Sequence, residues 1–251
     1  MRPDPASLDG RVVLITGAAQ RLGAETGRLL HAQGMDLILH YRRSRAPAEA
    51  LAGELEQRRP DSVRLVQADL CDLASLPALF KQVAGFRNRL DVLINNASSF
   101  YPTPIGEADE AQWEDLIGTN LKAPFFLAQQ AAPWLRQHHG CILNLVDIHG
   151  RRPLKGHPIY SIAKAGNAMM VQALARELGP EIRVNGVAPG AILWPDQGLD
   201  DAAKDAILAR TALGRPGTPG DIARALLYLI RDADYVTGQI LTVDGGRTIQ
   251  Q

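Results

Sequence analysis

The fold of this chain is decided by the segment VVLITGAAQRLG at Val12–Gly23. Its first residues are continuously apolar, which is typical of a strand buried on both faces of a parallel sheet. Glycines between a strand and a helix let the backbone approach a pyrophosphate, whose charge then lies at the helix N-terminus. The segment therefore predicts a dinucleotide-binding βα unit. The alternative is a tight turn in which glycine serves packing alone.

The same alternation of apolar runs and helical patterns continues along the chain. Strands are expected at Val12–Thr16, Asp36–His40, Val63–Gln67, Val92–Asn95, Ile142–Val146, Arg183–Val187 and Ile240–Val243. Helices are expected at Leu22–Gln33, Pro47–Gln57, Leu73–Val83, Leu121–Gln137, Ile159–Leu178 and Pro219–Leu229. No repeat or linker divides this pattern. The sequence predicts one α/β domain over residues 1–251, a doubly wound Rossmann fold whose seven-stranded parallel sheet has helices on both faces.

One long segment departs from the alternation. Residues 190–218 have no clear strand and are rich in Pro and Gly at both ends. A long segment beyond the carboxyl end of a strand is usually functional or disordered, and ligands of this architecture bind at that edge of the sheet. We expect a substrate-binding loop there, and the alternative is a surface loop without a role in binding.

The composition excludes several functional classes. The 251 residues are 46% apolar and carry 27 basic and 27 acidic side chains, so neither disorder nor a general attraction to nucleic acid or membranes is expected. Cys71 and Cys141 are far apart and the histidines are not clustered, so we expect no disulfide scaffold and no metal site. Neither a signal peptide nor an apolar run of about 18–20 residues is present, which favours a soluble cytoplasmic protein.

The end of the second strand indicates which dinucleotide binds. An NAD site needs a carboxylate there to accept from the ribose 2′-hydroxyl. This chain has no acid at that point and continues as His40-Tyr41-Arg42-Arg43-Ser44. A guanidinium binds a phosphate through two parallel charge-assisted hydrogen bonds, so the segment favours the 2′-phosphate of NADP. An exposed basic loop is the alternative.

Polar residues after the third and fourth strands fit the same ligand. Asp69, which precedes Leu70, is suited to accept from an adenine amino group, and the alternative is a cap for the helix expected near Leu73. The short polar side chains of Asn95–Ser98 follow the fourth strand, where they line the crevice at the change of strand order.

Tyr160 and Lys164 are four residues apart in a helical stretch, so they project from one face. A tyrosine ionises near pH ~10, and a nearby ammonium stabilises the phenolate and lowers that pKa. We therefore expect Lys164 to lower the pKa of Tyr160 and make it a proton donor to a double bond that receives hydride. The spacing alone is common on amphipathic helix surfaces. Its position after the fifth strand of a dinucleotide fold favours the catalytic interpretation.

These motifs together resemble the short-chain dehydrogenase/reductase family. The similarity extends essentially from Val12 to Gly246. It is carried by Thr16–Gly23, Asn95–Ala97, Asn120, Tyr160-x-x-x-Lys164, Val184–Gly190, Val236–Gly238 and Asp244–Gly246.

Two departures from the usual family pattern point to one branch. Arg21 stands where most members have a second glycine, and Asp147 stands where they have a serine. Both features, with the segments His40–Ser44 and Asn95–Pro104, resemble the pteridine reductase branch. That resemblance implies NADPH-dependent reduction of dihydropterins, with oxidised pterins and folates as further substrates, by a homotetramer packed through its two central helices.

The motifs and the resemblance together assign the site residues. Catalytic roles fall to Asn120, Asp147, Tyr160 and Lys164, with Asn120 bending a helix and supporting a water near the lysine, or else acting as an ordinary N-cap. Cofactor contacts are expected from Gly17, Gln20, Arg21, Leu22, Gly23, His40, Tyr41, Arg42, Arg43, Ser44, Asp69, Leu70, Asn96, Ala97, Ser98, Tyr160, Lys164, Pro189 and Gly190. Substrate contacts are expected from Arg21, Ser98, Phe100, Asp147, Tyr160 and Trp194, with the loop 149–157 beside them.

The chemistry of these residues suits a pterin. A pterin is flat and edged with donors and acceptors, so Phe100 can stack on one face while Arg21 binds an edge. Asp147 can supply protons to a ring nitrogen through Tyr160 or water, whereas an ionised aspartate would repel the oxyanion formed from a ketone. The alternatives are a reductase of another ketone, such as a 3-oxoacyl thioester or a sugar ketone, and a non-catalytic NADP-binding regulator.

Overall fold

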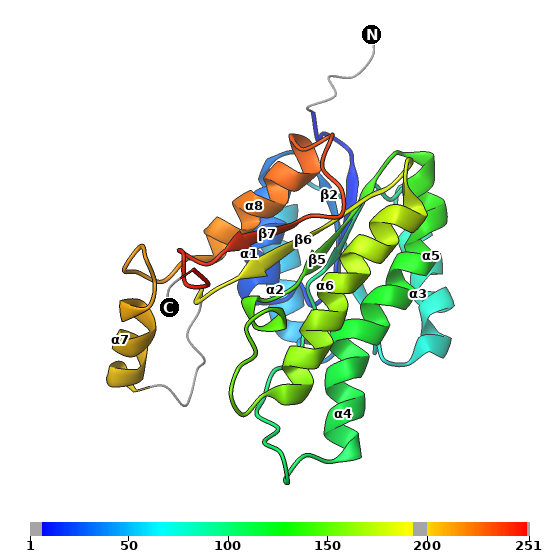
Figure 1. The fold of residues 1–251 in the computed structure, drawn as a ribbon. Coiled ribbons are helices and arrows are strands. Elements are labelled where there is room, and N and C mark those ends of the chain that lie inside the picture. The colour runs from blue at the N-terminus through cyan, green and yellow to red at the C-terminus, as the bar shows by residue number, and fades with distance from the viewer. Residues whose placement is uncertain (1–6, 193–199, 250–251) are drawn as a thin grey trace.

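The computed structural model describes residues 7–192 and 200–249. Its centre is a seven-stranded sheet in the order β3-β2-β1-β4-β5-β6-β7, and every neighbouring pair is parallel (Figure 1). The strands are β1 Val12–Ile15, β2 Asp36–Tyr41, β3 Val63–Gln67, β4 Val92–Asn95, β5 Cys141–Leu145, β6 Arg183–Pro189 and β7 Ile240–Val243. The predicted fold class is confirmed, and each strand lies within two residues of its expected bounds.

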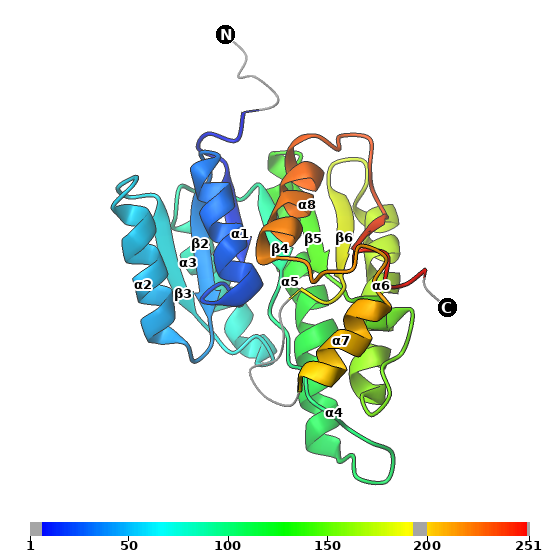
Figure 2. The same cartoon turned by 90° about the vertical axis from the view of Figure 1, so that its left-hand side faces the viewer.

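Helices cover both faces of the sheet (Figure 2). Helices α1, α2 and α8 pack on one face, and α3, α5 and α6 pack on the other. The helices are α1 Arg21–Ala32, α2 Arg45–Glu56, α3 Leu76–Ala84, α4 Glu110–Ile117, α5 Ala123–Gln137, α6 Pro158–Leu178, α7 Asp201–Ala209 and α8 Pro219–Arg231, with short turns η1 Leu73–Ser75, η2 Gly118–Lys122 and η3 Ile148–Gly150.

The apolar strands are explained by these two helical layers. Successive side chains of a strand point to opposite faces of the sheet. In β1, Val13 and Ile15 are buried in the cluster formed with α1 and α8, whereas Val12 and Leu14 are buried in the cluster formed with α3 and α5. Because both faces are covered, every position of β1 is buried, and no alternation of polar and apolar residues appears in its sequence.

Two helices were not predicted from the sequence pattern. Helix α4 has one buried residue, Leu116, and begins with a capping box between Asp109 and Gln112. Helix α7 has no buried residue, is capped by Asp200 and lies within the segment expected to be a loop. Both elements are short and make little use of an apolar face, so their periodicity is weak.

The fold brings the carboxyl ends of β1 and β4 together at the point where the strand order reverses. The amide of Thr16 donates to the carbonyl of Ile94, which joins the two strand ends directly. Among the described helices, none is long and apolar enough to cross a lipid bilayer.

Candidate active site

The turn after β1 requires its glycines. Gly17 has φ +61°, and a Cβ built there would lie 2.9 Å from the Ala97 Cα. A Cβ at Gly23 would lie 2.6 Å from the Gly17 carbonyl oxygen. In both cases a side chain would collide with the protein's own atoms, as the packing alternative for this turn requires. The predicted need for glycine in this turn therefore has a geometric basis.

The start of α1 places three further predicted residues. Gln20 is the exposed N-cap, and its side chain does not cap the helix. Arg21 is exposed and has φ +53°, a left-handed conformation that strains a non-glycine residue. This backbone explains why a glycine is common at this point of the family pattern. The side chain of Leu22 is half-buried and packs against the hydrophobic core.

His40 supports the turn from inside the protein. It is 2% exposed; its Nδ1 accepts a hydrogen bond from the Gly17 amide at 3.2 Å, and its Nε2 contacts the Ala68 carbonyl oxygen at 3.1 Å. The contact with a carbonyl requires Nε2–H, which defines the neutral tautomer. Burial lowers the pKa of His40 from 6.5 to about 4. His40 therefore holds the glycine turn against the end of β3.

The residues after β2 divide into buried and exposed groups. Tyr41 is buried against Ala19 and Ala48. Arg43 is exposed, and Ser44 is the half-buried N-cap of α2. Their positions at the carboxyl edge of the sheet leave Arg43 accessible to a ligand in solution.

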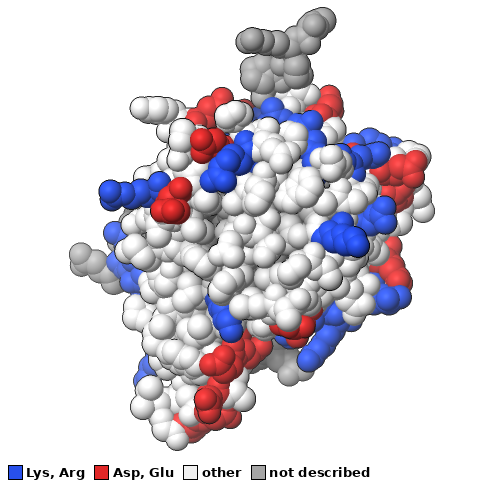
Figure 3. All heavy atoms as spheres, turned by 90° about the vertical axis from the view of Figure 1, so that its right-hand side faces the viewer, with Lys and Arg blue, Asp and Glu red and all other residues white. Residues whose placement is uncertain are grey.

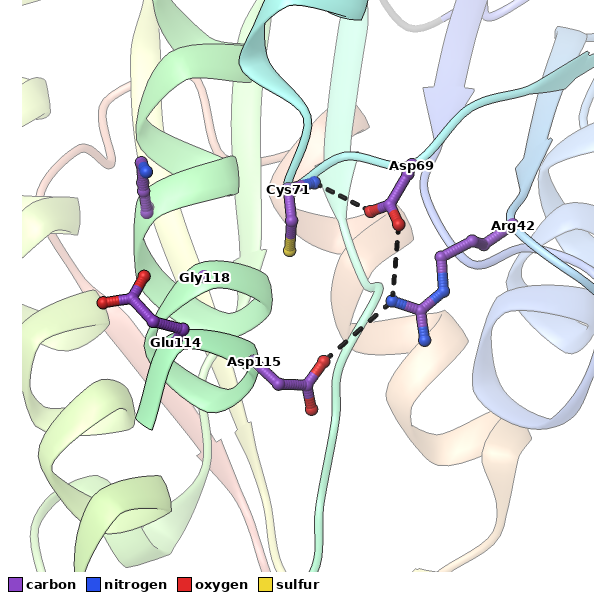
Figure 4. Close-up of a pocket in the computed structure, with 7 residues that line it drawn as sticks. Arg42, Asp69, Cys71, Glu114, Asp115 and Gly118 are labelled. Carbon is purple, nitrogen blue, oxygen red and sulfur yellow. Dashed lines mark hydrogen bonds and ion pairs between the residues drawn. The ribbon is translucent and has the colours of Figure 1, made fainter. Parts of the chain in front are cut away.

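Arg42 lies in a pocket of about 240 Å³ between β2 and α4 (Figure 4). Its Nη1 lies 3.9 Å from an Asp69 carboxylate oxygen and 4.0 Å from an Asp115 carboxylate oxygen. The second Asp69 oxygen accepts from the Cys71 amide at 3.0 Å. The pocket is lined by Arg42, Asp69, Cys71, Glu114, Asp115, Gly118 and Lys122.

Asp69 does not cap the helical turn that follows it. The side chain of Asp72 accepts from the Ala74 amide and is the cap of η1, so the capping alternative for Asp69 is wrong. Leu70, expected beside the cofactor, is buried in the core. Asp69 instead shares the pocket wall with Arg42 (Figure 4).

The end of β4 is fastened to the glycine turn. Asn96 donates through Nδ2 to the carbonyls of Thr16 and Gly17 at 2.8 and 3.0 Å. The Thr16 hydroxyl accepts from the amides of Asn96 and Ala97. Thr16 was not among the predicted site residues, although a threonine directly before the turn glycine is a signal that could have identified it. These bonds make the two strand ends one rigid unit.

Tyr160, Asp147 and Lys164 come together at the end of β5. The Tyr160 hydroxyl donates to the Asp147 carboxylate at 2.8 Å. The second Asp147 oxygen accepts from the His149 amide, also at 2.8 Å, so the carboxylate is fixed at both ends. Lys164 is buried and donates from Nζ to the Leu145 carbonyl at 2.8 Å.

The electrostatics of this group differ from the prediction. Burial and the neighbouring Asp147 carboxylate raise the pKa of Tyr160 well above 10, so the predicted lowering is wrong for this arrangement. The Lys164 Nζ lies over the Tyr160 ring, 5.6 Å from its centroid, and donates to a carbonyl instead of the phenol oxygen. Burial lowers the pKa of Lys164 from 10.5 to about 8. Tyr160 is therefore a protonated hydroxyl at neutral pH.

Phe100 lies beside Tyr160 at the opening of the site. It is 49% exposed, and its ring stands edge-on to that of Tyr160 with centroids 4.8 Å apart. His157 stacks on Phe100 with centroids also 4.8 Å apart and an interplanar angle of 11°. A core role for Phe100 is therefore excluded, and the loop 149–157 does reach the aromatic wall. Trp194, expected at the same wall, lies outside the described residues.

Asn120 lies in the π-helical turn η2 between α4 and α5. Its Oδ1 accepts from the Ser98 hydroxyl at 2.6 Å, and its Nδ2 donates to the carbonyls of Ser99 and Leu116. The N-cap of α5 is Lys122, so the capping alternative for Asn120 is wrong. The helical chain changes to π spacing at Asn120, and the Asn120 side chain holds the segment that precedes Phe100.

Pro189 and Gly190 end β6 at the same edge of the sheet. The Gly190 amide donates to the Val243 carbonyl at 3.0 Å, and a Cβ at Gly190 would lie 2.6 Å from the Asp244 Cα. Within residues 7–192 and 200–249, no group of three His, Cys, Asp or Glu side chains is arranged to hold a metal ion.

Known proteins resemble this chain over nearly its whole length. The family model described as enoyl-(acyl carrier protein) reductase matches residues 17–248. Pteridine reductase 1 of Leishmania tarentolae is 36% identical over 95% of this chain and 96% of its own. A 3-oxoacyl-(acyl-carrier-protein) reductase of Staphylococcus aureus is 36% identical over 93% of this chain and 96% of its own. One from Thermotoga maritima is 35% identical over 96% of this chain and 99% of its own.

Proposed function

The chain belongs to the short-chain dehydrogenase/reductase family, and within that family we propose that it is an NADPH-dependent pteridine reductase. Its substrates would be dihydropterins, with oxidised pterins and dihydrofolate as further substrates of the same ring chemistry. The likeness to Leishmania tarentolae pteridine reductase 1 supports this proposal. The equal identity to a 3-oxoacyl-(acyl-carrier-protein) reductase makes ketone reduction the second candidate.

The observation that carries the proposal is the hydrogen bond from Tyr160 to Asp147. A ketone reductase must stabilise the negative charge that develops on the substrate oxygen, and preorganised donors serve this purpose. Asp147 presents a carboxylate at the position where most of the family has a hydroxyl, and a carboxylate beside a developing alkoxide is repulsive. A ring nitrogen is basic enough to be protonated before the hydride is transferred, so the carboxylate would lie beside a cationic C=NH⁺ group and not beside an alkoxide. Asp147 therefore suits a pterin better than a ketone.

The residues at the switch point fit a dinucleotide cofactor. The glycine turn leads directly into the N-terminus of α1, where backbone N–H groups and the helix dipole favour a bound pyrophosphate. Arg43 is exposed beside Ser44 at the end of β2, where a 2′-phosphate would be bound. NADPH, when bound, supplies the hydride. The ammonium of Lys164 is suited to hydrogen-bond ribose hydroxyls from its buried position.

Residues of the protein itself bind the substrate, hold the proton and position the site. Phe100 supplies an exposed aromatic face for the substrate ring, and Arg21 supplies a guanidinium at the glycine turn for an edge of that ring or for the cofactor phosphate. Tyr160 holds a proton on its hydroxyl, and Asp147 accepts that hydrogen bond and is suited to pass a proton to Tyr160. Asn120 holds Ser98 and Ser99 in the segment that leads to Phe100.

We further propose that copies of the chain associate through α5 and α6, as the family resemblance implies for a tetramer. Figure 3 shows that the middle of the face on the α5 and α6 side is largely free of charged atoms. Phe125 of α5 and Ile162 and Met169 of α6 are exposed. Large apolar side chains exposed on a face with few charges are typical of contacts between proteins, and light scattering of the purified protein measures the resulting mass.

The function is tested by NADPH oxidation against two substrate classes. The panel contains dihydrobiopterin, dihydromonapterin and dihydrofolate on one side and a set of ketones, including a 3-oxoacyl thioester, on the other. We expect wild type to reduce pterins. Asp147→Asn should lower pterin turnover by about 10²–10⁴-fold, because the amide cannot titrate, and Asp147→Ser should lose pterin activity and gain weak ketone activity. Wild type that reduces ketones well and ignores every pterin would refute the proposal.

A further inference from the structure

The helix that carries Tyr160 and Lys164 presents a third polar residue on the same face. Asn167 follows Tyr160 by seven residues and Lys164 by three, and this spacing places all three along one side of α6. Asn167 is 2% exposed. Its Nδ2 donates to the backbone carbonyl of Asn120 at 2.7 Å. A buried amide therefore connects the helix of the proton donor to the π-helical turn.

The carbonyl of Asn120 needs an unusual partner because of the sequence that follows it. In an α-helix this carbonyl would accept from the amide of residue 124. That residue is Pro124, which has no N–H. The turn closes with π spacing instead, since the Ala123 amide donates to the Gly118 carbonyl. Asn167 supplies an N–H from a different helix to a carbonyl that has lost its α-helical donor.

The side chain of Asn120 in turn holds the segment that leads to Phe100, the aromatic residue proposed to contact the substrate ring. It accepts from the Ser98 hydroxyl at 2.6 Å and donates to the Ser99 carbonyl at 2.9 Å. The next residue is Phe100, whose ring stands edge-on to Tyr160. The contacts thus form a closed circuit that leaves α6 at Asn167, passes through Asn120 and the segment 98–100, and returns to α6 at Tyr160.

We propose that Asn167 is a positioning residue that sets the distance between the Phe100 platform and the Tyr160 hydroxyl by fixing Asn120. The proposal rests on the proposed function, because it assigns the platform to a flat substrate ring. Proton transfer requires the donor and the acceptor to lie within hydrogen-bond reach, and small misplacements of a bound substrate lower turnover strongly. Asn167 touches neither substrate nor cofactor in this assignment and acts through Asn120.

The stability of the protein offers a way to separate positioning from packing. Among the described residues, the Oδ1 of Asn167 has no hydrogen-bond partner, and a buried acceptor without a partner is unfavourable. Leucine has the same branching as asparagine and buries no polar atom. Asn167→Leu takes the Asn167 donor from the Asn120 carbonyl but also removes the unpaired Oδ1, so the urea midpoint should stay close to that of wild type.

Asn185 provides a matched control on β6. It is also fully buried, and its Nδ2 likewise donates to a backbone carbonyl, that of Val236, at 2.7 Å. Its Oδ1 accepts from the Gln239 amide, so both ends of this amide are satisfied. Asn185→Leu should lower the urea midpoint, because it leaves two backbone groups without partners, and it should leave turnover per folded molecule unchanged.

The experiment measures kcat and KM for dihydrobiopterin, the Kd of NADPH and the urea midpoint for wild type and both variants. We expect Asn167→Leu to lower kcat about 10–100-fold with the NADPH Kd within twofold of wild type. A kcat within twofold of wild type, or an equal loss in Asn185→Leu, overturns the proposal. If Asn167→Leu does not fold, Asn167→Ala is compared with Asn185→Ala by the same measurements and the same limits. Failure of the proposed function would be visible in wild type, which would not reduce the pterin at all.

Discussion

Low pH should reduce the stability of this protein through His40, which supports the glycine turn after β1. Its ring accepts from the Gly17 amide and contacts the Ala68 carbonyl, and both contacts are made by the neutral imidazole. Burial holds the pKa of His40 at about 4 in the folded protein, against 6.5 for an unperturbed histidine. Below pH 6.5 the unfolded chain therefore binds a proton that the folded protein does not.

The size of this effect follows from the two pKa values. They differ by about 2.5, and one pKa unit corresponds to about 1.4 kcal/mol, so the full loss of stability is about 3.5 kcal/mol. The contribution is intact above pH 6.5, is lost progressively below that pH and is gone once the pH has fallen through 4. Between pH 7.5 and pH 5, His40 alone should remove about 2 kcal/mol from the free energy of unfolding.

The assay is urea unfolding of wild type and His40→Asn at pH 7.5, 6.5, 5.5 and 5.0. The asparagine oxygen can accept from the Gly17 amide, but it does not titrate, so the variant should be less stable at neutral pH and should lose less stability toward pH 5. The difference between the two pH curves isolates His40, because His31 and the carboxylates are common to both proteins. Parallel curves would show that His40 is not held neutral by burial, and the reasoning would fail.

Three further outcomes are expected. Arg43→Ala should weaken NADPH binding roughly tenfold to a hundredfold, from the loss of about 1.5–3 kcal/mol of charge-assisted hydrogen bonding, and should change NADH binding little; equal losses for both cofactors would contradict the phosphate assignment. Phe100→Ala should raise the KM for the pterin and leave the NADPH Kd near normal, and unchanged pterin kinetics would remove Phe100 from the substrate wall. Because the pKa of Lys164 is about 8, kcat/KM for NADPH should fall above pH 8 in wild type, and Lys164→Met should lack this dependence; a flat wild-type profile would argue against an ammonium role.

The fold could be predicted because its signal is local and repeated. Strands covered by helices on both faces must be apolar throughout, so runs such as Val12–Ile15 are recognisable without any tertiary information. Helices α4 and α7 were not predicted, because they bury almost no apolar residues. They begin instead with side-chain caps, at Asp109 and Asp200. Periodicity therefore finds the elements that build the core and misses those that cover its edge.

The candidate site could be predicted only as a set of residues. Spacing placed Tyr160 and Lys164 on one face of a helix, and the structure brings Asp147 to the same point. The direction of the Tyr160 pKa depends on burial and on which charge lies nearer the hydroxyl, and neither can be read from spacing. The buried position of His40 likewise depends on tertiary contacts, with the Gly17 amide and the Ala68 carbonyl.

The half-buried Asp147 and the buried Tyr160 and Lys164 have to be interpreted as one electrostatic unit. Burial lowers the pKa of Lys164, and the Asp147 carboxylate acts in the opposite direction. Removing that carboxylate therefore does two things, because it takes away the hydrogen-bond acceptor of Tyr160 and also makes the Lys164 ammonium easier to deprotonate. A loss of activity in Asp147→Asn at a single pH would mix these effects. Their separation requires the pH dependence of kcat/KM for NADPH, which reports the free enzyme and hence Lys164, beside that of pterin turnover, which also contains the proton held between Tyr160 and Asp147.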